Sequence, residues 1–151
     1  MIRQFKGRVI TPGNITGNAL VSHEGVNPLA VWKDALLKKH KPAICNDQNN
    51  HDLYKKRVDG KILCLPQCIG STTAGLVIQV AAEMDIGPTA FLFSEHIDSL
   101  AASGVVISEI WQNKPIVTID QLGPEFLTFV KDDMQIEIHE DGTVLIDNHA
   151  N

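Results

Sequence analysis

The stretch of sequence that decides the fold is GKILCLPQCIGSTTAG, residues 60–75. Its first part, Lys61–Pro66, is a short apolar run of the kind that forms a buried strand. Apolar spacing over Ser71–Met84 then predicts a helix, with Ser71 as its N-cap and Gly70 allowing a tight turn before it. A strand that leads directly into a helix is the unit from which layered α/β folds are built.

The residues on either side of this stretch predict further strands and helices. A helix is predicted to begin at Asn27-Pro28, where an N-cap residue precedes a proline, and another over Ile97–Ser103, closed by Gly104. The polar segment Lys41–Asp59 is predicted to be a long loop. Strands are predicted at the apolar runs between turn residues, which are Phe5–Ile10, Asn18–Ser22, Thr89–Phe93, Val105–Ile107, Pro115–Ile119, Gln135–His139 and Thr143–Asp147.

The last two of these strands flank Glu140-Asp141-Gly142, and an Asp-Gly pair is typical of a hairpin turn. The middle of the chain therefore follows a β-α-β-α-β order, and β-rich ends close around it. We predict an α/β fold and, because neither a linker nor an internal repeat is found, one domain over residues 1–151.

Composition excludes several classes of protein. The chain has 151 residues, of which 44% are hydrophobic and 21% charged, as in globular proteins that need no disulfide or metal to fold. The formal net charge of −5 argues against a nucleic-acid partner. Neither an apolar run of ~18 residues nor a basic-then-apolar leader is found, so no membrane partner is predicted and a soluble, cytoplasmic protein is expected.

Charge is distributed unevenly along the chain. Residues 1–61 hold 11 Lys/Arg and five Asp/Glu, whereas residues 62–151 hold two Lys/Arg and 13 Asp/Glu. Eight of the basic residues lie between Lys33 and Lys61. Two interpretations stay open: a solvated basic surface, or a basic wall that faces an anionic substrate or an acidic partner.

The junction between the predicted strand and helix is a candidate anion site. Gly70 allows the turn, and Ser71, Thr72 and Thr73 place three hydroxyls beside the first N–H groups of the helix. Those N–H groups and the helix dipole favour a carboxylate or phosphate. The alternative is that Ser71 only caps the helix, which contributes ~1 kcal/mol to helix stability. Neither GxxxxGK nor GxGxxG is present, so no nucleotide site is predicted.

Histidines and cysteines do not form a metal-binding pattern. The six histidines have no HExxH-type spacing, and three cysteines form no disulfide framework. Cys64 lies in a predicted strand and is assigned to the core, while Cys45 lies in the polar loop, where we expect it to be exposed. Cys68 has two interpretations, a reactive thiol or cluster contact near the helix N-terminus, and a small apolar turn residue.

The run Gly60–Gly75 resembles the signature of the swivelling small domain of the aconitase X family, a GKxLxLP strand followed by GS(S/C/T)TGS at the start of a helix. Other segments resemble that family in the same order over about residues 7–120: GNALVS at 17–22, HDLY at 51–54, IGPTA at 86–90, SGVV at 103–106 and KPIV at 114–117. The resemblance implies a swivelling β/β/α domain, with three layers, a mixed sheet, helices and a second β layer.

The resemblance also implies an activity. Aconitase X proteins are hydro-lyases built from a large catalytic portion and a small swivel portion, which are fused or separate, and this chain has the size of the small one. Their known substrates are anionic hydroxy acids, mevalonate 5-phosphate or cis-3-hydroxy-L-proline. The resemblance therefore implies a large aconitase X-type catalytic subunit as partner. It also implies no cofactor in this chain, because an iron–sulfur cluster, where present, belongs to the large subunit.

Site residues are implied by position in the resembling motifs. In the wider aconitase superfamily a serine of the swivel domain removes the proton α to a carboxylate, and Ser71 occupies that position here. Gly70, Thr72, Thr73 and His51 are then expected to bind the anionic substrate.

The sequence departs from the family pattern in two segments. Residues 24–34 lack the family's glycine pair and its Ser-Phe-Trp triplet, and Asp52 replaces the usual proline after His51. An alternative function follows from these differences, a non-catalytic binding or regulatory module that keeps the swivel fold.

Overall fold

The computed structural model describes residues 1–70 and 72–148, which form eight strands and four helices. The strands are β1 (Ile2–Lys6), β2 (Arg8–Thr11), β3 (Ile15–Val21), β4 (Ile62–Leu65), β5 (Ala90–Phe93), β6 (Val117–Asp120), β7 (Gln135–Ile138) and β8 (Thr143–Asp147). The helices are α1 (Pro28–Lys38), α2 (Ala74–Glu83), α3 (Ser99–Ile110) and α4 (Pro124–Phe129). Within these residues no helix has both the length and the apolar character needed to cross a membrane.

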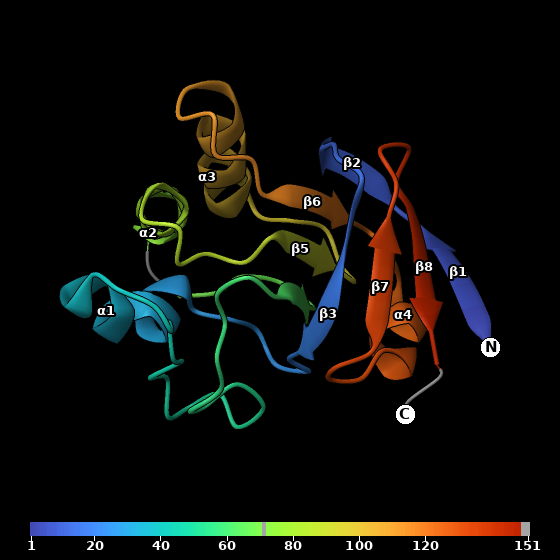
Figure 1. Ribbon diagram of the computed structural model, residues 1–151, viewed down its shortest axis with the longest axis horizontal. Coiled ribbons are helices and arrows are strands. Elements are labelled where there is room, and N and C mark those ends of the chain that lie inside the picture. Colours follow the sequence, from blue (N-terminus) through green and yellow to red (C-terminus); the bar gives the residue numbers. More distant parts are fainter. Residues whose placement is uncertain (71, 149–151) are drawn as a thin grey trace.

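The strands are ordered β1-β8-β7-β3-β4-β5-β6-β2, with β3 to β6 parallel to one another. β3 belongs to both halves, since Ile15–Asn18 pairs with β7 and Ala19–Val21 pairs with β4. The strands therefore form two facing layers. Figure 1 shows the three layers side by side, with α1, α2 and α3 on one face of the central sheet and β7, β8 and β1 on the other. The expected β/β/α arrangement is confirmed.

Two hydrophobic cores separate the three layers, and β4 faces both of them. Ile62 and Cys64 point into the core between the two sheets, while Leu63 and Leu65 point into the core beneath the helices. All four side chains are fully buried. Successive side chains of a strand point to opposite faces, so a strand covered on both faces has an unbroken apolar sequence.

One predicted strand is wrong. The segment 105–107 lies within α3, and Gly104 is an interior residue of that helix rather than its end. A Cβ at residue 104 would lie 2.7 Å from the carbonyl oxygen of Gly75 in α2. Gly104 is therefore required for the close packing of α3 against α2. In the sequence alone, a glycine with this role looks the same as a glycine that ends a helix.

The predicted strand Phe5–Ile10 is divided into β1 and β2 at Gly7. The chain crosses at Gly7 from one sheet to the other. Glycine is needed at this crossing because a Cβ would collide with the backbone oxygen of Asp120. At 124–129 the sequence pattern predicts no helix. Helix α4 forms there because Phe126 is fully buried in the inter-sheet core, edge-on to Phe5 with ring centroids 5.6 Å apart.

The segment 41–59 contains no named strand or helix, as expected, but it is folded against the rest of the protein. Ile44 and Arg57 form an isolated antiparallel bridge, and Cys45 N–H donates to the Lys56 carbonyl at 2.9 Å. The expectation that Cys45 is exposed is wrong, because its exposed fraction is 1%. Its side chain belongs to the core under the helices, together with Ala43, Leu53 and Val58.

Candidate functional site

The carboxyl ends of the four parallel strands meet at one edge of the central sheet. The segments that leave this edge begin at Ser22 after β3, Pro66 after β4, Ser94 after β5 and Gln121 after β6. Ligands of parallel α/β sheets bind outside the carboxyl ends of the strands. We therefore place the candidate site at this edge, which includes the turn predicted from the sequence.

The turn after β4 is held by the segment that follows β3. Val26 N–H donates to the Gln67 carbonyl at 2.9 Å, and Ile69 N–H donates to the Val26 carbonyl at 2.8 Å. Gly70 then adopts a φ of +96°, which favours glycine. A Cβ at this position would lie 2.5 Å from Nδ2 of Asn27, the N-cap residue of α1. Glycine is thus required both by backbone conformation and by space.

Helix α2 begins at Ala74, three residues later than predicted, with Thr73 as its N-cap. The Thr73 side chain makes no capping hydrogen bond to the helix, and the first turn holds no acidic residue. Val77 N–H donates to the Thr73 carbonyl at 3.0 Å. The amides that precede it stand at the positive end of the helix dipole, where an anion is stabilised.

Of the predicted site residues, Gly70, Thr72 and Thr73 lie together in this turn and are exposed. Ser71 lies outside the described residues, so its assignment as the base stays a prediction. His51 is exposed as well, but its described contact is with the segment after β3: its Nδ1 lies 3.4 Å from Oε1 of Glu24. Binding of substrate by His51 also remains a prediction.

A second histidine–carboxylate pair lies next to the first and was not found from the sequence. His23 follows β3, and both its backbone N–H (2.7 Å) and its ring Nδ1 (3.2 Å) contact Oδ2 of Asp52. Burial raises the pKa of Asp52, but the hydrogen bonds from His23 and the charge of Lys56 outweigh it, and the pKa is lowered overall. The sequence signal was Asp52 itself, which departs from the family pattern.

The ends of β5 and β6 are tied together by an arginine. Arg8 donates from Nε and Nη2 to the two oxygens of Asp120, at 3.0 and 2.7 Å, and Asp120 is fully buried. Arg8 Nη2 also lies 3.3 Å from Nε2 of His96, whose Nδ1 is 2.7 Å from the Ile97 carbonyl. A carbonyl only accepts and a guanidinium only donates, so this contact pair fits neutral His96 with hydrogen on Nδ1.

The three cysteines are buried, although Cys68 lies in the turn that follows β4. Cys64 and Cys68 are buried, and burial raises the pKa of both thiols well above the ordinary value. The thiol form is inert toward nucleophilic chemistry, so the structure favours the interpretation of Cys68 as a small apolar turn residue. Within residues 1–70 and 72–148, no three His, Cys, Asp or Glu side chains gather where they could hold a metal ion.

The basic residues between Lys33 and Lys61 do not form a single wall around the turn. Three of them are in ion pairs, Lys38 with Asp34, Lys56 with Asp132 and Arg57 with Asp59. The others are spread over α1 and the segment that follows it. The arrangement is closer to a solvated basic surface than to a wall facing the candidate site.

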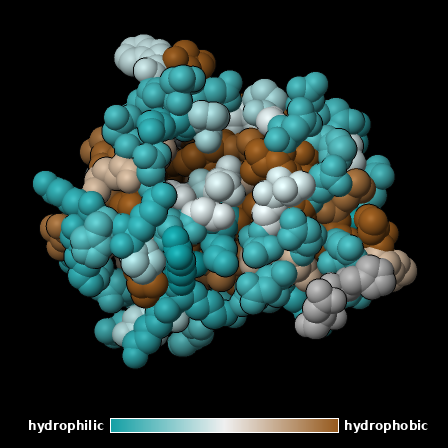
Figure 2. Space-filling model, viewed as in Figure 1, coloured by the Kyte–Doolittle hydropathy of each residue, from teal (hydrophilic) through white to brown (hydrophobic). Residues whose placement is uncertain are grey.

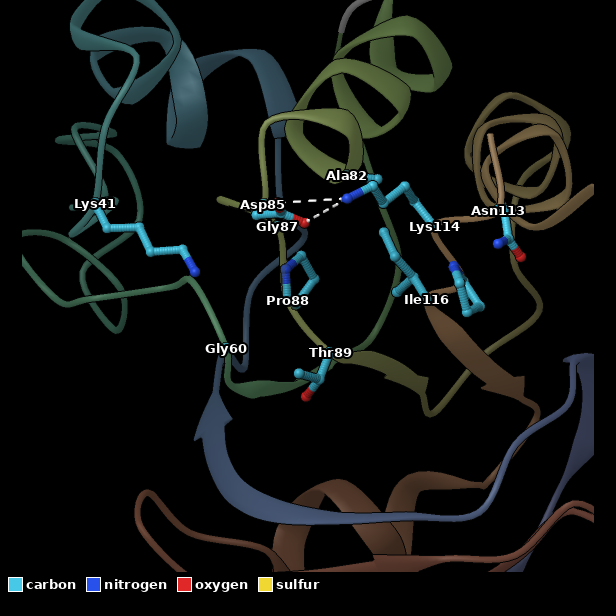
Figure 3. Close-up of a pocket in the computed structure, with 11 residues that line it drawn as sticks. Lys41, Gly60, Ala82, Asp85, Gly87, Pro88, Thr89, Asn113, Lys114 and Ile116 are labelled. Atoms are coloured by element: carbon cyan, nitrogen blue, oxygen red, sulfur yellow. Dashed lines mark hydrogen bonds and ion pairs between the residues drawn. The ribbon is translucent and has the colours of Figure 1, made fainter. Parts of the chain in front are cut away.

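A separate pocket of about 330 Å³ lies at the opposite edge, where the parallel strands begin. Figure 3 shows Lys41 extending toward it from one side and Lys114 paired with Asp85 on the other, at 3.2 Å between Nζ and Oδ1. Gly60 and Thr89, which precede β4 and β5, form its floor. It therefore lies far along the strands from the turn at Gly70.

The family model for the aconitase X swivel domain matches residues 4–146. The chain belongs to this family. The resemblance drawn from the stretch 60–75 is thereby confirmed. Among similar proteins, the phosphomevalonate dehydratase small subunit of Methanosarcina mazei is 29% identical over 131 residues, covering 85% of this chain and 80% of that protein. The protein of the same name from Pyrococcus furiosus is 30% identical over 121 residues, covering 76% and 77%.

The fold is also similar to that of a solved aconitase X protein. The crystal structure of Thermococcus kodakaraensis aconitase X in its holo-form superposes with a TM-score of 0.80 at 24% sequence identity. The match covers 97% of this chain and 99% of that chain. The two chains therefore share the three-layer architecture over almost their entire lengths.

Proposed function

We propose that this chain is the small subunit of an aconitase X-type hydro-lyase that dehydrates an anionic hydroxy acid. The names of its relatives favour mevalonate 5-phosphate as substrate, with cis-3-hydroxy-L-proline as the second candidate. The observation that carries the proposal is the exposure of Gly70, Thr72 and Thr73 at the carboxyl edge of a family swivel domain. Their turn leads into a helix N-terminus that has no acidic residue in its first turn.

The turn supports a division of roles in the reaction. Ser71 removes the proton α to the substrate carboxylate, the C–H electrons form the double bond, and the C–O bond breaks so that the hydroxyl leaves as water. Gly70, Thr72, Thr73 and the first amides of α2 hold a substrate anion. A serine hydroxyl has a high pKa, so its action as a base needs stabilisation by further groups. The large subunit supplies those groups in this proposal.

The cysteines of this chain do not fit an iron–sulfur cluster. Cys45, Cys64 and Cys68 come from a loop, a strand and a turn, all three are buried, and they form no ligand group among the described residues. We assign no cofactor to this chain. Any cluster then belongs to the large subunit, and the steps assigned to this chain do not use it.

Apolar side chains around the turn support docking of a large subunit there. Leu76 and Val80 lie one turn apart on α2, exposed by 60% and 37%. Exposed apolar residues from three neighbouring segments complete this surface, which we call the docking patch: Leu29 of α1, Ile69 of the turn, Leu76 and Val80 of α2, and Leu100 of α3. Figure 2 shows the face of the molecule seen in Figure 1, on which apolar areas lie between polar side chains. Burial of such a patch favours association.

One observation bears on the alternative of a non-catalytic module. The divergent segment 24–34 supplies Val26 and Asn27, which hold the turn in place through the contacts described above. The divergent segment therefore supports the turn to which the proposal assigns anion binding. This favours the enzyme over the binding module.

The test is reconstitution with the aconitase X-type large subunit from the same genome. We expect dehydration of mevalonate 5-phosphate by the pair and none by either chain alone. Ser71→Ala should lower kcat by more than tenfold, which is about 1.4 kcal/mol of barrier. The matched control is Ser99→Ala, an exposed serine in the first turn of α3, which should leave kcat unchanged. A loss below tenfold for Ser71→Ala would remove its claim to be the base.

A further inference from the structure

The pocket at the amino edge of the central sheet has the chemistry of a site for an aromatic side chain. This amino-edge pocket has a volume of about 330 Å³, and the buried residues Ala82, Pro88 and Ile116 give it an apolar lining. Lys41 and Lys114 extend toward it from opposite sides (Figure 3). An aromatic ring gains from both features, since its body is apolar and its faces attract ammonium groups.

The pocket is held in shape by hydrogen bonds. Gly60 N–H donates to the Gly87 carbonyl at 3.1 Å, and Lys114 N–H donates to the Ser108 carbonyl at 2.9 Å. The ammonium of Lys114 is itself held by Asp85, with 3.2 and 3.4 Å from Nζ to the two carboxylate oxygens. A pocket that is formed before its occupant arrives loses little freedom on binding, which favours affinity.

The charges around the pocket argue against a free anion as its occupant. Asp85 lines the pocket and pairs with Lys114, which leaves Lys41 as the unpaired lysine of the lining among the residues that the structure describes. The helices α2 and α3 both end at this edge, and the carboxyl end of a helix carries about half a negative charge. An uncharged, largely apolar group therefore fits the pocket better than a phosphate or carboxylate does.

The chain presents such a group next to the pocket. Trp111, which directly follows α3, is exposed by 84%, the highest exposure among the large hydrophobic residues that the structure describes. Tryptophan is well buried on average in folded proteins. Asn113 lines the pocket two positions later, so the Cα atom of Trp111 lies within ~8 Å of the Cα atom of Asn113. Trp111 thus stands beside the pocket without filling it.

We propose that two copies of this chain associate through a symmetric contact in which Trp111 of each copy enters the amino-edge pocket of the other. The proposal is independent of the function proposed above. In a twofold contact one surface meets itself, so a projecting side chain beside a fitting pocket is used twice. Two indole rings then leave water together, and tryptophan in a pocket is typical of the residues that contribute most to binding.

The charges of the two surfaces favour the same contact. Inserting Trp111 brings the carboxyl end of α3, with its negative partial charge, to the pocket of the second copy. Glu109 in the last turn of α3 adds a carboxylate, whose Oε2 atom has no hydrogen-bond partner. The unpaired Lys41 stands at that pocket. Opposite charges therefore approach each other in both halves of the contact.

The first arm of the test uses the full chain alone. Sedimentation velocity from about 1 to 100 µM, a range that covers weak complexes, should show monomers and dimers in equilibrium. Trp111→Ala should raise the dissociation constant at least tenfold. The matched control is Leu76→Ala, a 60% exposed residue of the docking patch, which should leave the constant unchanged. A wild-type chain that stays monomeric, or a loss for Leu76→Ala as large as that for Trp111→Ala, would overturn the proposal.

The second arm tests whether Trp111 enters the pocket. Thr89 is exposed on the floor of the pocket, so Thr89→Tyr should fill it without entering the core and should also raise the dissociation constant. A mixture of Thr89→Tyr and Trp111→Ala chains retains one of the two insertions. It should therefore dimerise more strongly than either variant alone. A contact made by the two tryptophans with each other would give no such recovery, and that result would contradict insertion.

Fluorescence provides a readout in the wild-type chain. The chain has two tryptophans, and Trp32 is 1% exposed, so iodide should quench Trp111 selectively. Quenching should decrease as the chain concentration rises into the dimer range, and quenching that stays constant would refute the contact. A large subunit is the competing occupant. If Trp111→Ala weakened only the binding of a large subunit and left self-association unchanged, Trp111 would belong to that interface and the proposal would be wrong.

Discussion

Gly70 and Asn27 lie in direct contact, and this contact joins the two segments that build the site. A Cβ at residue 70 would come within 2.5 Å of Nδ2 of Asn27, and the Oδ1 atom of the same side chain accepts from Ala30 N–H at 3.4 Å. Asn27 therefore begins α1 while limiting the space available to the turn before α2. Position 70 is further restricted by its φ of +96°.

We predict that Gly70→Ala destabilises the chain by about 1–3 kcal/mol, because it adds backbone strain and a collision with Asn27. Asn27→Ala should cost about 1 kcal/mol through the lost cap. In the double variant the collision is removed while the strain persists, so the combined loss should be smaller than the sum of the two single losses. Urea unfolding of the four proteins measures this coupling. Strictly additive losses would show that the contact carries no strain.

The docking patch makes a prediction about assembly. Leu76→Asp should leave the free energy of unfolding of the chain nearly unchanged, because the side chain is exposed, but should prevent association with the large subunit. The matched control is Ile110→Asp, 67% exposed at the far end of α3, about 15 Å along the helix from Leu100. Co-purification with a tagged large subunit measures both. Equal retention by the two variants would place the interface elsewhere.

Those parts of the fold that depend on local pattern could be predicted from the sequence. The unbroken apolar run of β4, the Asp-Gly hairpin between β7 and β8, and the Asn27-Pro28 start of α1 are each set by residues close in the chain. Helix α4 has no such local signal, since it depends on burial of Phe126 against Phe5, 121 residues away. Gly104 was misassigned for the same reason, because its partner Gly75 lies on another helix.

The same distinction holds for the site. The turn at Gly70 could be predicted from the sequence, because a glycine followed by hydroxyl-bearing residues at the start of a helix is a local pattern. The His23–Asp52 pair is formed by residues from two segments that only the tertiary fold brings together. Asp52 could be noticed as unusual, but nothing in the sequence indicated which side chain it would face.

A further prediction concerns the thiols. Cys45, Cys64 and Cys68 are buried, and burial raises the pKa of each, so the reactive thiolate is suppressed in the folded chain. A water-soluble aromatic disulfide should therefore modify all three much more slowly in the native chain than in urea. Cys68→Ala should leave the slow native rate unchanged. A native Cys68 that reacts as fast as in the unfolded chain would restore its interpretation as a reactive thiol.

The last prediction concerns stability in acid and rests on Asp59. Its carboxylate is buried and accepts from Ala43 N–H at 2.7 Å and from Arg57 Nε and Nη2 at 3.0 and 2.8 Å. Burial raises the pKa of Asp59, but the hydrogen bonds from Arg57 and Ala43 outweigh it, and the pKa is lowered from 3.8. The ionised form is thus favoured by folding. Its contribution is complete at pH values well above 3.8 and is lost as the pH falls through that value and the lowered pKa of the folded chain.

Asp59→Asn should therefore destabilise the chain at pH 7 by about 1–3 kcal/mol. Both carboxylate oxygens of Asp59 accept hydrogen bonds, and in asparagine one of them is replaced by an NH2 group, which cannot accept from Arg57 or Ala43. The difference from the wild-type chain should shrink as the pH falls below 3.8, because the wild-type carboxyl then becomes neutral as well. Asp133→Asn, at an exposed turn position with a φ of +68° that asparagine adopts readily, is the control and should change stability little at any pH. Urea unfolding of the three proteins from pH 7 to pH 3 measures the effect. A loss for Asp59→Asn that stays constant over this range would show that the Asp59 carboxylate charge does not stabilise the fold.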